Sequence, residues 1–157
     1  MMVSGSEISG REIEVSLNGE LDISSSKIKL DEGIVTNDGG KFRIRGSVVE
    51  SGRTCINKDG YEILECRDSE LRGENGLVFI EGDSNIIDGV KIYSRDNGIL
   101  LNGESEADLK RVEITSEETG IRYEGERIEK LESIKIKARE AVSIGGGELE
   151  VTGNDIS

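Results

Sequence analysis

The chain has 157 residues, the length of one domain and enough to enclose a continuous core. It carries 33 acidic and 20 basic side chains, and the resulting charge of −13 argues against nucleic acid or an anionic membrane surface as a partner. It has no histidine, which removes the commonest general base and metal ligand, and no proline, which suits strands that are paired on both sides.

Nothing in the sequence assigns a compartment. No apolar run approaches the roughly 20 residues of a membrane span, and no basic segment followed by an apolar one opens the chain as a signal peptide would. The localisation therefore stays open.

A pattern recurs along the chain in steps of 20 to 22 residues. Each unit has an apolar residue, two variable residues, a small or β-branched residue, one variable residue and a second apolar residue. Because seven units are too many for chance, the chain is a repeat protein. In chain order they lie at Ile23/Ser26/Ile28, Ile44/Ser47/Val49, Cys66/Ser69/Leu71, Ile87/Val90/Ile92, Leu109/Val112/Ile114, Leu131/Ile134/Ile136 and Val151/Asn154/Ile156.

Apolar residues two positions apart within each unit indicate strands. A second apolar register follows the first six units, at Ile34, Cys55, Leu77, Ile99, Ile121 and Val142. Such a unit cannot bury its apolar side alone, so we expect units to stack, each strand pairing with its equivalent in the next unit. The pattern predicts an all-β solenoid with parallel sheets of about seven coils. Residues 11–157 form this single domain, and residues 1–10 form an N-terminal tail or cap.

The charged residues support in-register stacking. Outward residues one unit apart should be ladder neighbours, where like charges are unfavourable. Eleven of the twelve adjacent charged pairs in three predicted rows are opposite in sign, whereas about half would be by chance. The rows are Lys27, Val48, Glu70, Lys91, Glu113, Lys135, Asp155; Asp22, Arg43, Glu65, Ile86, Asp108, Lys130, Glu150; and Ser24, Arg45, Arg67, Asp88, Lys110, Glu132, Thr152.

The stretches LKRVEITSEETGIRYEG (109–125) and VTGNDIS (151–157) resemble repeats of the right-handed parallel β-helices of the pectin-lyase-like superfamily. The resemblance implies a right-handed parallel β-helix solenoid with coils of 20–22 residues. A leucine-rich repeat is the rival, because LESIKI (131–136) fits the start of its motif. The Asn or Cys which that motif requires after the core strand is replaced by Asp31, Glu117 and Arg139.

Enzymes of the resembled superfamily act on acidic polysaccharides with carboxylates, a histidine, or calcium and arginine. Asp83, Asp88 and Asp96 lie in one coil and are the nominees for such a role. Solvated ladder charges explain them more simply, so we assign no catalytic residue. We also predict no cofactor or metal, because the acidic turns at 37–40, 57–60 and 81–85 lack calcium-loop spacing and read as Asx-Gly turns.

Two residue types have a structural interpretation within the repeat. Cys55 and Cys66 fall in different stacks, which favours two buried free thiols over a disulfide. Ser26, Ser47 and Ser69 share one row and predict an internal hydroxyl ladder.

One row departs from the charged pattern. If the second register points inward, then Val35, Ile56, Val78 and Leu100 point outward as an aliphatic ridge, with Ile80 nearby. Contiguous apolar stripes usually mark an interface. The alternative is that the N-terminal segment MMVSGSEI or a turn folds over the ridge.

Three functions remain open. The first is a non-enzymatic structural or interaction module that binds itself or another protein through the ridge or an open coil end, since the last unit stops inside the pattern. The second is a carbohydrate-binding or polysaccharide-cleaving domain, for which Tyr61 and Tyr93 are the available aromatic residues. The third is an engineered solenoid without function.

Overall fold

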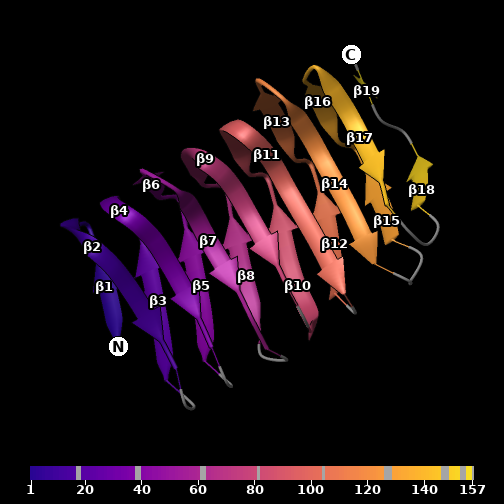
Figure 1. The fold of residues 1–157 in the computed structure, drawn as a ribbon. Coiled ribbons are helices and arrows are strands. Elements are labelled where there is room, and N and C mark those ends of the chain that lie inside the picture. Colours follow the sequence, from indigo (N-terminus) through magenta and orange to yellow (C-terminus); the bar gives the residue numbers. More distant parts are fainter. Residues whose placement is uncertain are drawn as a thin grey trace.

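The computed structural model describes residues 1–16, 19–37, 40–60, 63–80, 82–103, 105–125, 129–145, 149–152 and 155–156. They form an all-β parallel solenoid of about six turns, which confirms the predicted fold class. Successive coils stack in sequence order, and the two ends of the chain lie at opposite ends of the stack (Figure 1). Within these ranges there is no helix.

Each coil contributes to two parallel sheets. The eight-stranded sheet consists, in order, of β1 (Met2–Ser4), β3 (Glu20–Ser24), β5 (Lys41–Arg45), β8 (Leu64–Arg67), β10 (Gly82–Asp88), β12 (Ser105–Lys110), β15 (Glu129–Glu132) and β18 (Leu149–Thr152). The eleven-stranded sheet contains β2 (Glu7–Val15), β4 (Lys27–Thr36), β6 (Val48–Ser51), β9 (Glu70–Phe79), β11 (Lys91–Gly103), β13 (Glu113–Ser116), β16 (Lys135–Lys137) and β19 (Asp155–Ile156), with β7 (Thr54–Lys58), β14 (Thr119–Gly125) and β17 (Glu140–Ile144) beside its longer strands.

The two sheets meet at a corner that each coil from the first to Ser133 turns in the same way. One residue per coil has a left-handed backbone there, with φ between 46° and 68°: Gly5, Ser25, Gly46, Asp68, Gly89, Arg111 and Ser133. Interstrand hydrogen bonds continue through the corner, as from Asp68 N to Asp88 O at 2.9 Å. A non-glycine residue in this conformation costs free energy, and the uninterrupted ladder on both sides fixes it.

The predicted serine ladder lies directly after this corner and is confirmed. Ser26 N donates to Ser47 Oγ at 3.1 Å, and Ser47 N donates to Ser69 Oγ at 3.2 Å. Ser47 Oγ in turn donates to the carbonyl oxygen of Arg45 at 2.9 Å. Each buried hydroxyl therefore has a donor and an acceptor partner, which is the condition for placing it inside.

The first ten residues, predicted as a tail or cap, form strands in register with the next coil. Met2 pairs with Asp22 in the eight-stranded sheet, and Glu7 pairs with Lys27 in the eleven-stranded sheet. The segment MMVSGSEI therefore lies in line with the two sheets and does not fold over the outward face at Val35.

The core consists of aliphatic rows stacked along the coils. Glycines at the bends let the backbone approach these rows closely. Ile92 and Ile114 are buried next to each other in one row. At the following bend, a Cβ added to Gly98 would lie 2.4 Å from Ile114 Cγ2 and 2.5 Å from the carbonyl oxygen of Gly120. Gly98 thus lets the chain turn against the isoleucine row of the next coil.

Replacing Gly98 by alanine should lower the free energy of unfolding by about 1–3 kcal/mol, because the added methyl group overpacks against both side chain and backbone. Urea denaturation followed by circular dichroism measures the change. Gly10→Ala is the matched control, since a Cβ there meets nothing nearer than Leu30 Cδ2 at 4.0 Å. Equal effects of the two substitutions would contradict the packing argument.

Candidate functional site

The outward charged rows have the register that the sequence predicts. In the eleven-stranded sheet, Lys91 pairs with Glu70 on one side and with Glu113 on the other, and Glu113 pairs with Lys135. Lys135 Nζ lies 3.4 Å from Glu113 Oε1. Exposed pairs of this kind contribute only about 0.2–1 kcal/mol each, so their main effect is to fix register.

A partly buried carboxylate bridges the like-charged neighbours Arg45 and Arg67, which the predicted rows place side by side. Glu65 Oε1 lies 2.5 Å from Arg67 Nε, and Glu65 Oε2 lies 3.3 Å from Arg45 Nη2. The hydrogen bond from Arg67 is the main reason that the pKa of Glu65 is lowered, and it outweighs desolvation. The repulsion between the two arginines is therefore offset within the ladder.

Of the three nominated carboxylates, Asp88 and Asp96 have described side chains, and these two residues lie in different sheets. Asp88 Oδ1 lies 2.7 Å from Arg111 Nε and its Oδ2 lies 3.3 Å from Arg67 Nη1, so both oxygens are paired. The hydrogen bond from Arg111 lowers the pKa of Asp88. Asp96 is exposed at a register shift in β11, in the other sheet, and the side chain of Asp83 lies outside the described residues. Asp88 is thus a structural ion-pair partner.

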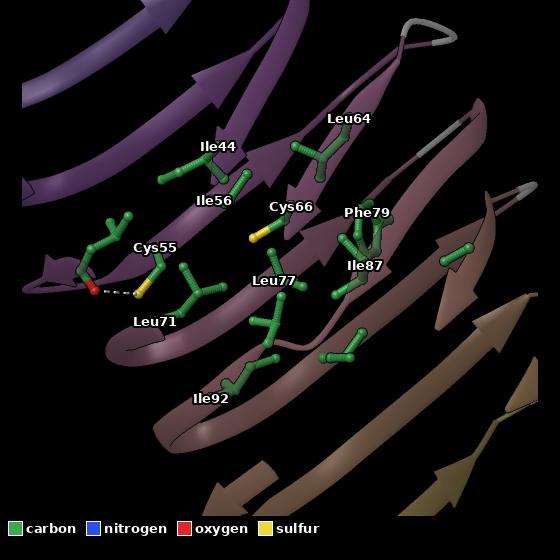
Figure 2. Packing of buried hydrophobic residues seen from close by; sticks show 14 of the residues in the cluster. Ile44, Cys55, Ile56, Leu64, Cys66, Leu71, Leu77, Phe79, Ile87 and Ile92 are labelled. Atoms are coloured by element: carbon green, nitrogen blue, oxygen red, sulfur yellow. Dashed lines mark hydrogen bonds between the residues drawn. The ribbon is translucent and has the colours of Figure 1, made fainter. Parts of the chain in front are cut away.

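Both cysteines are free and buried, which confirms the prediction of two thiols. Burial raises the pKa of Cys55 to about 12, and it also raises the pKa of Cys66. Cys55 Sγ lies 3.8 Å from the carbonyl oxygen of Val49, the contact drawn as a dashed line in Figure 2. Neither thiol is a nucleophile near neutral pH, because the thiolate is the reactive form. No acidic or cysteine side chains in the described part of the chain cluster as a metal site would require.

The structure corrects the predicted ridge at Ile56. Ile56 is fully buried and pairs with Ile34 and Leu77, so it belongs to the inward row (Figure 2). Cys55 takes the position that glycine holds at Gly33 and Gly76, where the chain bends. The residue that points outward in this coil is Asn57.

We call the resulting outward row the aliphatic stripe, and it comprises Val35, Asn57, Val78 and Leu100, with Ile80 beside it. Its members are half-buried neighbours in the ladder. The Oδ1 atom of Asn57 is shielded from solvent and accepts no hydrogen bond from any described residue.

The stripe ends in opposite charges, which sequence reasoning missed. Glu14 precedes Val35 in the row and Arg122 follows Leu100, and both are exposed. The pairing of residues one coil apart was the signal for both, since Glu14 pairs with Val35 and Arg122 pairs with Leu100.

A second surface feature is a groove of about 500 Å³ on the eleven-stranded sheet. Tyr93 lies in it with 41% of its surface exposed, and the Arg72 guanidinium lies 5.5 Å from the centre of its ring. Arg95 Nη2 lies 3.2 Å from Glu74 Oε1 on the same wall. The sequence pointed to Tyr93 but not to Arg72, although Arg72 occupies the same ladder position one coil earlier. Tyr61, the other predicted aromatic, lies outside the described residues.

Comparison with known proteins leaves the fold and these two surfaces as the guides to function. No family model, curated protein or solved structure matches the chain. In the described part of the chain there is also no helix that is long and apolar enough to cross a membrane.

The lowered pKa values of Glu65 and Asp88 predict acid sensitivity. Carboxylates whose pKa is lower in the folded than in the unfolded protein stabilise the fold above their unfolded values, near 4. This stabilisation is lost as the pH falls through the folded values. We expect the melting temperature to fall between about pH 5 and pH 2. Glu65→Gln should lower it at pH 7 and flatten the acid-side decline, as thermal unfolding at a series of pH values would show.

Lys137→Gln, which removes an exposed charge outside this network, is the control and should follow the wild-type profile. A Glu65→Gln profile parallel to the wild type down to pH 2 would contradict the assignment.

Proposed function

We propose that the chain is a rigid, non-enzymatic interaction module that binds a protein partner through the aliphatic stripe. One observation carries the proposal: the outward row of Val35, Asn57, Val78 and Leu100 has three aliphatic residues in four consecutive coils, whereas charges of alternating sign dominate the three rows described above. Side chains in an outward row gain no stabilisation from packing inside the core. An apolar run there, rimmed by polar residues, is typical of an interaction surface.

The stacked coils supply the rigidity that such a surface needs. Each stripe residue stands on a strand hydrogen-bonded to its neighbours, at the ladder spacing of about 4.8 Å. Binding to a surface that is already ordered loses little conformational entropy, so a small apolar patch can still give useful affinity. The paired state of Asp88 and the raised thiol pKa values favour this function over catalysis.

Ligand selection tests the proposal without knowledge of the natural partner. Peptides selected from a random library against the wild-type protein should bind at the stripe, and Val78→Lys with Leu100→Lys should weaken them at least tenfold, about 1.4 kcal/mol. Isothermal titration calorimetry measures the affinities. The control is Glu12→Gln with Lys137→Gln, which changes two exposed side chains elsewhere on the same sheet. Selected peptides that bind both double variants equally would contradict the proposal.

The Tyr93 groove favours a second candidate, which is a glycan-binding domain. An exposed aromatic ring beside paired arginine and glutamate side chains offers a stacking face and hydrogen-bonding groups for hydroxyls. Membership of the pectin-lyase-like superfamily, whose enzymes act on polysaccharides, would fit this candidate and is proposed with it. The candidate is second because the face has one described aromatic residue.

Tyrosine fluorescence provides the test, since the chain has three tyrosines and no tryptophan. Titration with neutral and acidic oligosaccharides should change the emission of the wild type, and Tyr93→Ala should abolish the change. Because Tyr123 is buried, Tyr93 is the described tyrosine that a surface ligand reaches. An unchanged emission across the oligosaccharide panel would remove this candidate.

A further inference from the structure

We infer that the partner of the aliphatic stripe is a second copy of this chain, docked face to face in an antiparallel two-fold dimer. The inference rests on the proposed function, because it names the partner of that same surface. It follows from the order of residues along the row, which runs through Glu14, Val35, Asn57, Val78, Leu100 and Arg122 before it continues to Ser143.

The charged ends of this row and the aliphatic residues next to them are complementary to the reversed row, and at the centre Asn57 faces Val78. A two-fold axis parallel to the strands, passing between Asn57 and Val78, places the row on the same row of a second copy with the coils in opposite order. Glu14 then faces Arg122 of the second copy, and Val35 faces its Leu100. Each of these contacts occurs twice, once on either side of the axis.

The two charges at the ends of the row are available for such a contact. Glu14 is exposed on the edge strand β2 and has no ion-pair partner among the described residues. Arg122 is also exposed and donates from Nε to Glu124 Oε1 at 2.7 Å. A guanidinium has five N–H donors, so its terminal nitrogens can bind a second carboxylate.

The same charges exclude the parallel arrangement. A two-fold axis along the stack would place each coil opposite its own equivalent, so that Glu14 would face Glu14 and Arg122 would face Arg122. Like charges across an interface are costly, which gives the antiparallel dimer its specificity.

Asn57 strengthens the argument from the middle of the row. In the antiparallel dimer the two Asn57 residues flank the axis and are offset by one ladder step, about 4.8 Å. Rotation of the amide lets each Oδ1, which accepts no hydrogen bond from the described chain, receive the Nδ2 donor of the other copy. This amide pair adds a polar contact across the axis to the apolar contacts on either side of it.

The small contact area predicts a weakly associating dimer. The row from Glu14 to Arg122 spans five ladder steps, about 24 Å, and five strand residues give a width of about 17 Å. The two copies together would bury about 800 Å², below the roughly 1,200 Å² of a standard stable interface. We therefore expect dimerisation with a dissociation constant on the order of 0.1 mM.

Charge reversal with equilibrium sedimentation tests this arrangement, using protein at about 0.02–1 mM to bracket that constant. Glu14→Arg alone places two arginines opposite each other across the interface, and Arg122→Glu alone places two glutamates there. Each should weaken dimerisation at least tenfold, whereas an equimolar mixture of the two single variants should recover it as a heterodimer. The double variant, with Glu14→Arg and Arg122→Glu in one chain, should recover it as a homodimer.

The controls are Glu7→Arg and Lys137→Glu, which reverse exposed charges elsewhere on the same sheet and should dimerise like the wild type. Melting temperatures confirm that all variants fold. A wild type that remains monomeric at about 1 mM, or a mixture that does not recover association, overturns the second-copy inference. If the selected peptides nevertheless require Val78 and Leu100, the interaction module stands and its partner is another protein.

Discussion

Every feature of this protein depends on one constraint, the in-register stacking of equivalent residues about 4.8 Å apart. A side chain in this fold contacts the residues at the same position one coil before and one coil after. Consecutive residues of one row must therefore be able to pack against each other. Aliphatic rows fill the interior, and charges of alternating sign cover much of the exterior. The serine row follows the same rule, because each hydroxyl is satisfied by the backbone of the adjacent coil.

The constraint also explains where exceptions can be tolerated. Arg45 and Arg67 are like-charged neighbours, and the carboxylate of Glu65 between them offsets their repulsion. Asp88 is held in the same manner by arginines from two coils. Asp88, a catalytic candidate in the linear sequence, is thus an ion-pair partner that helps to keep the exterior rows in register.

Function is best sought where a row departs from the requirements of stacking. The aliphatic stripe is such a departure, because stacking does not require Val35, Val78 and Leu100 to be apolar on the outside. The groove at Tyr93 is another, since its aromatic ring and arginine lie on a face that is otherwise made of ion pairs. The stripe is the stronger of the two, because its terminal charges and the aliphatic residues next to them form a self-complementary order.

The sequence by itself determined the period, the parallel stacking and the outward charged rows, because a repeat of 20 to 22 residues leaves one register that matches every unit.

The sequence did not determine how each coil turns at its second bend, which precedes the second inward row. The interval between the two inward rows is six residues from Leu71 to Leu77 but seven from Ile92 to Ile99, so either Cys55 or Ile56 fits the third coil. In the tertiary structure Ile56 occupies the second inward row, where it stacks between Ile34 and Leu77. Cys55 then occupies the bend, and Gly73 in the next coil leaves room for its sulfur, since a Cβ there would lie 3.0 Å from Cys55 Sγ. That choice, made by packing between coils, turned Asn57 outward and set the composition of the stripe.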